Sequence, residues 1–295
     1  LIKHPNAGGV LVLGLGCENN QLQGLLEYAA LKNEKPIKFF NAQDVRDEVE
    51  AGVAAVGELA EIVGTFQRVE CLTSDLVIGL KCGGSDGFSG ITANPLVGRV
   101  ADRLTALEGT AILTEVPEMF GAEQVLMDRA LNEEVFHAIA TMINDFKEYF
   151  GRYRQPIDAN PSTGNLQGGI TTLEEKSLGA VQKGGTAAVA QVLSYGEQAT
   201  EKGLVLLSAP GNDAVSATAE VVSGATVLLF TTGRGTPFGA PVPTIKISSN
   251  PAYGIRVKPK WIDFDAGTLI LEEQRTFEDA ADQLFQYVLD VASRR

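Results

Sequence analysis

Long apolar runs, cysteines and positive charge are all scarce in this sequence of 295 residues. No run approaches the roughly 20 apolar residues that a membrane-spanning helix needs, and no signal peptide is recognisable, so we expect no membrane partner. The cysteines at positions 17, 71 and 82 give no disulfide framework and favour a reducing cytoplasm. With 24 basic and 37 acidic side chains, the net charge of −13 disfavours nucleic acid as a partner. An acidic ligand would therefore need local positive charge.

The composition that remains, 44% hydrophobic and 21% charged, is typical of a globular protein with an ample core. The chain starts with Leu1-Ile2-Lys3 instead of methionine and soon enters a predicted strand. We interpret it as a fragment of a longer polypeptide that lacks its N-terminal part.

Apolar runs that end in glycine or polar residues alternate with segments of helical spacing. They predict strands over 9–16, 35–41, 76–80, 109–115, 203–209, 225–232, 244–249 and 261–265. Helices are predicted over 21–31, 42–63, 96–107, 117–130, 133–154 and 277–292. Two further helices are predicted, one that Thr171 or Thr172 caps, and one that Asn212 or Asp213 caps and that ends at Val222. This alternation predicts an α/β fold with mostly parallel sheets and helices on both faces, in Rossmann-like layers. The Pro- and Gly-rich stretch 155–169 predicts a linker or lid, which divides the chain into lobes 1–154 and 155–295.

The most informative stretch is KCGGSDGFSGITANP, residues 81–95, between a predicted strand and a predicted helix. In an open α/β sheet, ligands bind beyond the carboxyl ends of the strands. Glycines there let backbone N–H groups approach an anion, although a turn can also be glycine-rich for steric reasons alone. Because Cys82, Ser85 and Asp86 all follow the strand directly, we interpret the stretch as a functional loop.

Further candidates follow other predicted strands and helices. Glu115 and Glu118 follow the strand 109–115, where a carboxylate can be a metal ligand or a base, or can complement a helix dipole. Lys176 and Lys183 are candidate bases if burial lowers the pKa of one of them, although most lysines are solvated. Arg234, between Gly233 and Gly235, is well suited to bind a carboxylate through its planar guanidinium.

The first predicted strand ends in GLGCEN, which superficially suggests a dinucleotide loop. The third glycine of that motif is absent, and no acidic residue ends the second strand where a ribose would need it. A nicotinamide-dependent oxidoreductase is therefore a weak alternative.

Taken together, several long motifs resemble the altronate/galactarate dehydratase family, and within it the altronate dehydratases. The motifs are HPNAGGVLVLGLGCENN, KCGGSDGFSGITANP, LTEVPEMFGAEQ, GGITTLEEKSLG, SAPGNDAV and LFTTGRGTP. The resemblance covers residues 4 to about 267. It implies a cytoplasmic hydro-lyase of hexuronate catabolism that converts D-altronate to 2-dehydro-3-deoxy-D-gluconate and water. The resemblance also implies Fe(II) or Mn(II) as the cofactor, and a further N-terminal part of the same polypeptide.

The resemblance and the residue types suggest roles for particular side chains. The expected metal ligands are the thiols Cys17 and Cys82 with the carboxylates Glu18 and Glu115, since a mixed shell suits Fe(II) better than Mg²⁺. Asp86 is expected as a further oxygen ligand or in the catalysis, with Ser85. Lys176 or Lys183 would be the base. The substrate would be held by a set of residues in the second lobe: Arg234, Gly233, Gly235, Thr236, Asn212 and Lys246.

Three alternatives remain open at this point. The chain could act as a galactarate dehydratase or a sulfolactate sulfo-lyase of the same family. It could instead be a sugar-acid-binding fragment without activity. A homo-oligomer is possible, and the sequence does not specify one.

Overall fold

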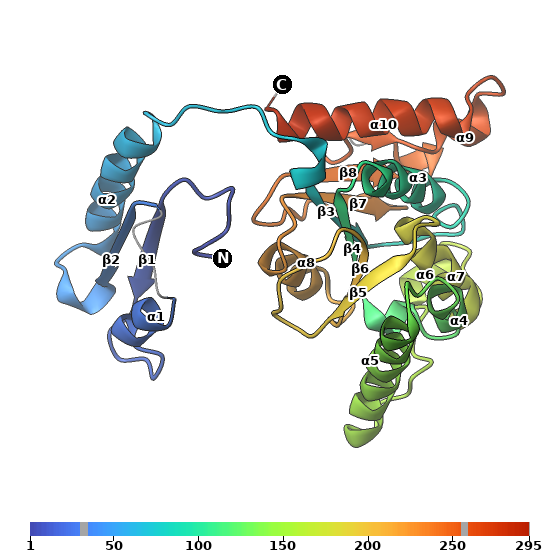
Figure 1. Cartoon of the computed structure of the whole chain (residues 1–295), viewed down its shortest axis with the longest axis horizontal. Helices are drawn as coiled ribbons and strands as arrows, with labels where there is room; N and C mark the ends of the chain where they lie inside the picture. The colour runs from blue at the N-terminus through green and yellow to red at the C-terminus, as the bar shows by residue number, and fades with distance from the viewer. Residues whose placement is uncertain (30–34, 255–258, 295) are drawn as a thin grey trace. The chain divides into compact units, whose positions relative to one another are not determined.

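The N-terminal unit, residues 1–71, is built on two parallel strands in the computed structural model of the protein, which describes residues 1–29, 35–254 and 259–294. Strand β1 (Val10–Gly14) pairs with β2 (Ile37–Asn41), and the helices are α1 (Leu22–Ala29) and α2 (Glu48–Val63) (Figure 1). Asp47 caps α2 by accepting hydrogen bonds from the N–H groups of Val49 and Glu50. The predicted end of the first helix at Leu31 lies outside the described residues.

The C-terminal unit, residues 72–295, is built on one parallel sheet of seven strands in the order β5-β6-β4-β3-β7-β8-β9. The strands are β3 (Val77–Cys82), β4 (Thr110–Leu113), β5 (Val189–Leu193), β6 (Gly203–Leu207), β7 (Val227–Thr232), β8 (Thr244–Ser248) and β9 (Phe264–Asp265). All four residues of β4 and all six of β7 are buried. Strands covered on both faces read as continuous apolar runs, which explains why the sequence predicted them.

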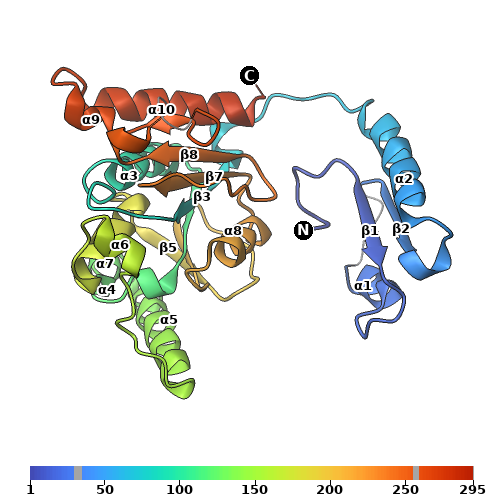
Figure 2. The same cartoon turned by 180° about the vertical axis from the view of Figure 1, so that it is seen from behind.

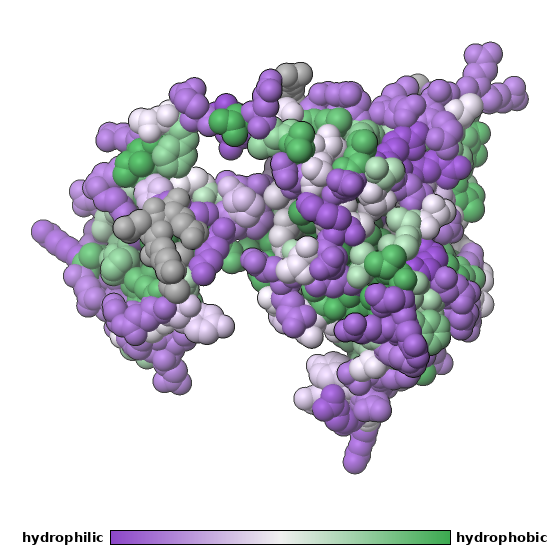
Figure 3. Space-filling model, in the orientation of Figure 1, coloured by the Kyte–Doolittle hydropathy of each residue, from purple (hydrophilic) through white to green (hydrophobic). Residues whose placement is uncertain are grey.

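Helices cover both faces of this sheet (Figures 1 and 2). Helices α3 (Ala93–Ala106), α5 (Glu133–Arg152) and α10 (Phe277–Ala292) bury their apolar faces in one core cluster, and α8 (Asp213–Val222) packs into a second cluster. Shorter helices are α4 (Glu123–Met127), α6 (Thr163–Gln167), α7 (Leu173–Val181) and α9 (Thr268–Leu271). The outer face of α10 is polar (Figure 3), as expected for a helix with one side in the core. The predicted α/β class with helices on both faces is confirmed.

The division of the chain differs from the predicted boundary between residues 154 and 155. Strands from both sides of that boundary share the seven-stranded sheet, since β4 pairs with β6 and β3 with β7. The units divide instead near residue 71, in the stretch 64–72, which contains neither helix nor strand. The stretch 155–169 is a surface connection that contains the short α6.

Two other predicted elements are much shorter than expected, and the sequence did not indicate one of the observed strands. The predicted helix 117–130 contains only a turn, Val116–Glu118, and α4. The predicted strand 261–265 is reduced to the two residues of β9 at the edge of the sheet. Strand β5 was not predicted, because its run of five residues is short and contains a glutamine. Among the described residues, no helix is both long and apolar enough to cross a membrane.

Candidate active site

The carboxyl end of β3 opens into a pocket of about 370 Å³. Cys82 ends the strand, and Gly83, Gly84 and Ser85 continue into the pocket wall. Gly84 has φ of 64°, a left-handed conformation that glycine adopts without the penalty of a Cβ atom. Segments after other strands, the beginning of α6 with the residues before it, and α7 complete the wall. They contribute Pro117, Glu118, Asn160, Ser162, Gly164, Asn165, Lys176, Gly211, Asp213 and Arg234. This is the edge at which open parallel sheets bind ligands.

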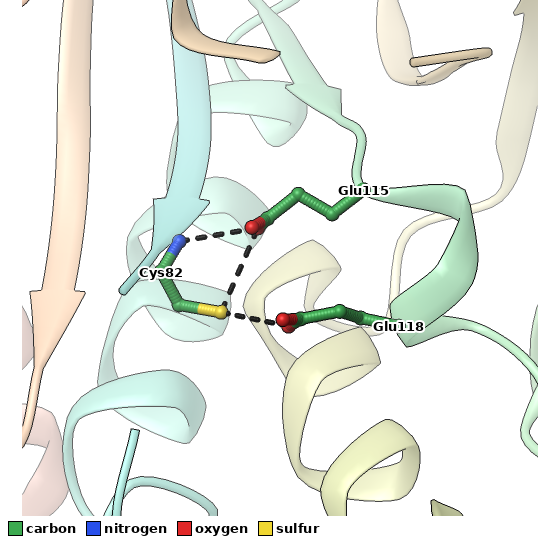
Figure 4. A group of neighbouring side chains, drawn as sticks. All are labelled: Cys82, Glu115 and Glu118. Carbon is green, nitrogen blue, oxygen red and sulfur yellow. Dashed lines mark hydrogen bonds between the residues drawn. The ribbon is translucent and has the colours of Figure 1, made fainter. Parts of the chain in front are cut away.

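One thiol and two carboxylates meet beside this pocket (Figure 4). Cys82 Sγ lies 3.0 Å from Glu118 Oε2 and 3.6 Å from Glu115 Oε2. The backbone N–H of Cys82 donates to Glu115 Oε2 at 3.1 Å. The sulfur and one oxygen of each carboxylate all lie within 4.8 Å of one another. These three side chains therefore form a group that could hold a metal ion.

Three buried lysines surround the same carboxylates. Lys176 Nζ lies 2.5 Å from Glu118 Oε1, and Lys183 Nζ lies 3.4 Å from Glu115 Oε2. Lys81, which has no exposed surface, forms an ion pair with Glu115 Oε1. Burying a charge is costly unless it is paired, so the three lysines make it possible to keep two carboxylates in the interior.

Glu115 is held in an uncommon backbone conformation, with φ of 71° and ψ of 57°. For a residue with a Cβ atom this left-handed region is unfavourable, and such residues are concentrated at functional sites. The contacts with Lys81, Lys183 and the Cys82 N–H over-determine the position of the carboxylate. The strand-end carboxylate that the sequence indicated is therefore a buried charge at the centre of the cluster.

The ion pairs determine the protonation states around the pocket. Burial raises the pKa of the Cys82 thiol to about 11, and the two glutamates add to the rise, so the thiol is protonated at neutral pH. Burial alone would raise the pKa of Glu118, but the three lysines outweigh burial and lower it. Burial alone would lower the pKa of Lys176, but attraction to Glu118 raises it. Lys176 and Glu118 are therefore an ammonium and a carboxylate.

The two candidate lysines differ in access. Lys176 lines the pocket, whereas Lys183 has only 1% of its surface exposed and is absent from the lining. Both are surrounded by carboxylates instead of the apolar side chains that would lower a lysine pKa. Of the two, Lys176 is the one that a ligand in the pocket could touch.

Both carboxylate oxygens of Asp86 accept hydrogen bonds from neighbouring side chains. Its Oδ1 accepts hydrogen bonds from the hydroxyls of Ser89 (3.1 Å) and Ser249 (2.8 Å), and its Oδ2 accepts one from Asn250 Nδ2 (2.9 Å). Asp86 is buried. It does not line the pocket at the end of β3, but it lines a second pocket of about 470 Å³ together with Ser85 and Lys176. Its carboxylate joins the loop after β3 to the loop after β8. Ser85 does line the pocket, and its carbonyl accepts a hydrogen bond from Asn165 Nδ2 at 2.8 Å.

Arg234 projects into the pocket wall from the loop after β7. Among the described residues, no carboxylate forms an ion pair with it, and its side chain is exposed. Gly235 has φ of 81°, and Gly233 leaves room for Asp86, whose Cγ would lie 2.4 Å from an added Cβ. The Gly-Arg-Gly pattern therefore presents an arginine that is available to an anionic ligand.

The other residues expected to bind substrate lie outside the lining of this pocket. Asn212 caps α8 by accepting a hydrogen bond from the Val215 N–H at 3.3 Å. Thr236 Oγ1 accepts one from the Phe238 N–H at 3.1 Å. Lys246 lies in β8 and is half-buried.

Cys17 and Glu18 belong to the N-terminal unit, where they follow β1. The Glu18 carboxylate accepts hydrogen bonds from the N–H groups of Leu15 (2.8 Å) and Gly16 (2.6 Å), and Cys17 is exposed. These backbone hydrogen bonds lower the pKa of Glu18. A shared metal site with Cys82 remains a prediction.

Sequence reasoning gave no role to Lys81 or Asp213. Lys81 Nζ lies 2.9 Å from Asp213 Oδ1, and it also donates to the Cys82 carbonyl at 2.8 Å. A lysine inside an apolar strand was the available signal, because a buried ammonium needs anionic partners. The sequence predicts Asp213 only as one of two candidate caps of α8, and the residue that caps this helix is Asn212.

Two family models match the chain. The C-terminal model of D-galactarate/altronate dehydratase covers residues 73–295, and the second-domain model of D-galactarate dehydratase/altronate hydrolase covers residues 1–64. The chain belongs to the D-galactarate/altronate dehydratase family. The two matches also agree with the division of the chain near residue 71.

Curated relatives in this family share extensive identity with the chain. The altronate dehydratase of Bacillus subtilis is 56% identical over 99% of the chain and 58% of its own length. The altronate dehydratase of Escherichia coli is 52% identical over 92% of the chain and 54% of its own length. The galactarate dehydratase (L-threo-forming) of Escherichia coli is 39% identical over 98% of the chain and 57% of its own length. The chain thus spans a little over half the length of these three relatives.

Proposed function

We propose that this chain carries the reaction centre of a hydro-lyase that dehydrates D-altronate to 2-dehydro-3-deoxy-D-gluconate. The observation that carries the proposal is the pocket itself. Its wall contains a lysine–glutamate pair and an arginine that forms no ion pair with any residue the structure describes. The higher identity with the two altronate dehydratases than with the galactarate dehydratase supports altronate as the preferred acid.

Arg234 is the proposed anchor of the substrate carboxylate. The buried cluster is close to neutral, since Lys81, Lys176 and Lys183 offset the charges of three carboxylates, Glu115, Glu118 and Asp213. The charge of Arg234 is therefore left for a ligand, and its fork can bind a carboxylate through two hydrogen bonds. Gly233 and Gly235 shape the loop of the same proposed anchor, because their N–H groups donate to the Gly84 carbonyl (3.1 Å) and to Thr232 Oγ1 (3.0 Å). Ser85 would contact a substrate hydroxyl, as would Thr236, Asn212 and Lys246 if the substrate reaches beyond the pocket.

Lys176 is the proposed group that exchanges a proton with the substrate. Dehydration breaks the C2–H bond and the C3–O bond, and the C3 hydroxyl must gain a proton to leave as water. Held as an ammonium by Glu118, Lys176 is suited to donate that proton. The first prediction, that Lys176 or Lys183 is the base, would require a neutral amine. Lys183 would keep Glu115 in place from behind the pocket.

Fe(II) or Mn(II) is the proposed metal. A thiol with two carboxylates suits these ions better than Mg²⁺, and Cys82, Glu115 and Glu118 offer that donor set within reach of one ion. An ion there would compete with the lysines that now contact the same carboxylates. When bound, such a cation stabilises negative charge that develops on the substrate carboxylate. Cys17 and Glu18 remain proposed as additional ligands.

The same proposal includes the setting of the enzyme. We propose a cytoplasmic protein of hexuronate catabolism whose complete polypeptide carries a further N-terminal part that contributes to the site. A homo-oligomer is compatible with it. The second candidate function is galactarate dehydration, favoured by the 39% identity over nearly the whole chain.

The test is formation of 2-keto-3-deoxy acid from D-altronate under anaerobic conditions, with and without added Fe(II) or Mn(II). Galactarate and sulfolactate are assayed in parallel. We expect metal-dependent turnover that is fastest with D-altronate. Faster turnover of galactarate would favour the second candidate. Tight binding of these acids without turnover, by this chain and by longer polypeptides that contain it, would overturn the enzyme assignment in favour of a binding module.

A further inference from the structure

Asp213 is the carboxylate of the pocket that the proposed function leaves without a role. It is the first residue of α8, its side chain is 41% exposed, and it lines the same pocket as Lys176 and Arg234. Its Oδ1 contacts the buried Lys81 Nζ at 2.9 Å. Its Oδ2 forms no hydrogen bond or ion pair with any other residue that the structure describes. Lys81 therefore fixes one carboxylate oxygen of Asp213, and the other oxygen has no such contact among the described residues.

Local structure is adapted to bring this carboxylate to the pocket. A Cβ atom on Gly83 would lie 2.7 Å from Asp213 Oδ2 and 2.7 Å from the Phe230 ring, so only glycine leaves the space that the carboxylate occupies. Lys81 contacts the Phe230 ring from 5.7 Å, which fixes its ammonium between Asp213 and the strand end. A carboxylate at the start of α8 is also favoured by the helix dipole.

The other carboxylate in the pocket wall is already occupied. Glu118 Oε1 pairs with Lys176, and its Oε2 accepts a hydrogen bond from the Cys82 thiol at 3.0 Å. Its side chain is only 13% exposed. Among the described residues that line the pocket, Asp213 is thus the carboxylate with an oxygen free to accept a proton from a ligand.

On the basis of the proposed function, we propose that Asp213 is the base that removes the C2 proton of the sugar acid, and that Lys81 is its positioning residue. The C2–H bond breaks, its proton passes to Asp213 Oδ2, and its electron pair forms the C2–C3 double bond. The C3–O bond breaks with its electrons on oxygen, which takes a proton from Lys176 and leaves as water. The enol then tautomerises to the 2-keto acid. Asp213 releases its proton to solvent, and Lys176 takes up a proton from solvent.

The test uses Asp213→Asn in the protein at its natural length. Asparagine keeps the shape of the side chain, and Lys81 retains Glu115 and the Cys82 carbonyl as partners, so we expect the fold to persist. Loss of a general base typically costs about 10²- to 10⁴-fold, so we expect kcat to fall at least about 100-fold. We expect KM to change less than about threefold, because the Arg234 anchor is intact. Asp145→Asn, an exposed residue of α5, is the matched control.

A second measurement separates chemistry from structure. With substrate deuterated at C2, a larger isotope effect on kcat in Asp213→Asn than in the unmodified protein supports the role as base, and Asp213→Glu should recover part of the rate. If Asp213→Asn does not fold, Asp213→Ser takes its place in both measurements. A kcat within about tenfold of the unmodified protein, or an unchanged isotope effect, overturns the inference. If the unmodified protein dehydrates none of the three acids, the proposed function fails, and this inference fails with it.

Discussion

At the scale of single residues, the site depends on which charges have partners inside the protein. Lys81, Lys176 and Lys183 each face a buried carboxylate, whereas Arg234 has no anionic partner among the described residues. Paired charges organise the site, and the unpaired one is available to the ligand. Substitution of Arg234 should therefore change mainly the affinity for substrate, and substitution of the paired residues should change mainly the rate of the reaction.

Arg234→Ala tests the affinity part of this separation. We expect KM for D-altronate to rise by about 100-fold, since a charge-assisted hydrogen bond pair to a carboxylate is worth roughly 3 kcal/mol. Because the carboxylate is bound before and during reaction, kcat should change less than KM. Steady-state kinetics measures both, with Arg152→Ala on the exposed end of α5 as control. An unchanged KM would remove Arg234 from the substrate site.

Glu220 provides a residue-scale prediction for stability. It is fully buried in α8, its Oε1 accepts a hydrogen bond from the Leu80 N–H at 3.0 Å, and its Oε2 has no partner among the described residues. Burial, with a contribution from Glu115, raises the pKa of Glu220 from 4.5 to about 8. A raised pKa means that the folded state binds the proton more tightly than the unfolded state. The stabilisation is therefore complete below the unfolded pKa and is lost as pH rises towards the folded pKa.

Glu220→Gln should remove the loss of stability that accompanies ionisation of Glu220 as pH rises. Between about pH 5 and about pH 8 we expect the free energy of unfolding of the variant to gain roughly 2–4 kcal/mol on the unmodified protein, at 1.4 kcal/mol per pK unit. Urea unfolding followed by Trp261 fluorescence at several pH values measures it. Glu148→Gln, an exposed residue of α5, should show no such trend. Parallel pH profiles for the unmodified protein and Glu220→Gln would contradict the prediction.

At the scale of elements, the sequence predicted which residues lie at the ends of the strands better than it predicted which strands lie side by side. Cys82, Glu115 and Arg234 each follow an apolar run, so their place at one edge of a parallel sheet could be inferred. The order of the strands in the sheet could not be inferred. Strand β3 lies between β4 and β7, and β7 begins at Val227, 145 residues after β3 ends at Cys82. Without this order, nothing predicted that Lys81 would meet both Glu115 and Asp213. The contacts of Asp86 could not be predicted for a similar reason, since its partners Ser249 and Asn250 are remote in sequence.

Gly98 tests how α3 supports the site. A Cβ atom there would lie 2.2 Å from the Gln182 carbonyl oxygen and 3.1 Å from the Gly185 backbone, so α3 packs directly on the turn that carries Lys183. Backbone atoms cannot move aside as a flexible side chain can. Gly98→Ala should therefore destabilise the C-terminal unit by about 1–3 kcal/mol.

The comparison for Gly98→Ala is Gly151→Ala in α5, where an added Cβ has no atom within 4 Å. There alanine should stabilise the helix by about 0.5–1 kcal/mol, because glycine loses more conformational freedom on folding. Urea unfolding of both variants distinguishes close packing from helix propensity. Equal effects of the two substitutions would show that α3 has room for a side chain at this position.

At the scale of the whole molecule, two compact units coincide with two matched family models. The sequence placed the boundary at the long loop after α5, because loops of that composition often separate domains. That loop lies on the surface of one unit instead, and the strands before and after it complete a single sheet. Composition reports where the chain is irregular, whereas a domain boundary depends on which strands pair.

This division predicts two cooperative unfolding transitions. Each unit has its own sheet, and separate cores generally unfold as separate units. Trp261 is the one tryptophan of the sequence and lies in the C-terminal unit, so its fluorescence follows that unit alone. Far-UV circular dichroism follows the helices of both. In a urea titration we expect the circular dichroism to show a change that the fluorescence lacks, and Gly98→Ala should shift the fluorescence midpoint while leaving that additional change in place. Coincident midpoints for both signals, in the unmodified protein and in Gly98→Ala, would mean that the two units unfold as one.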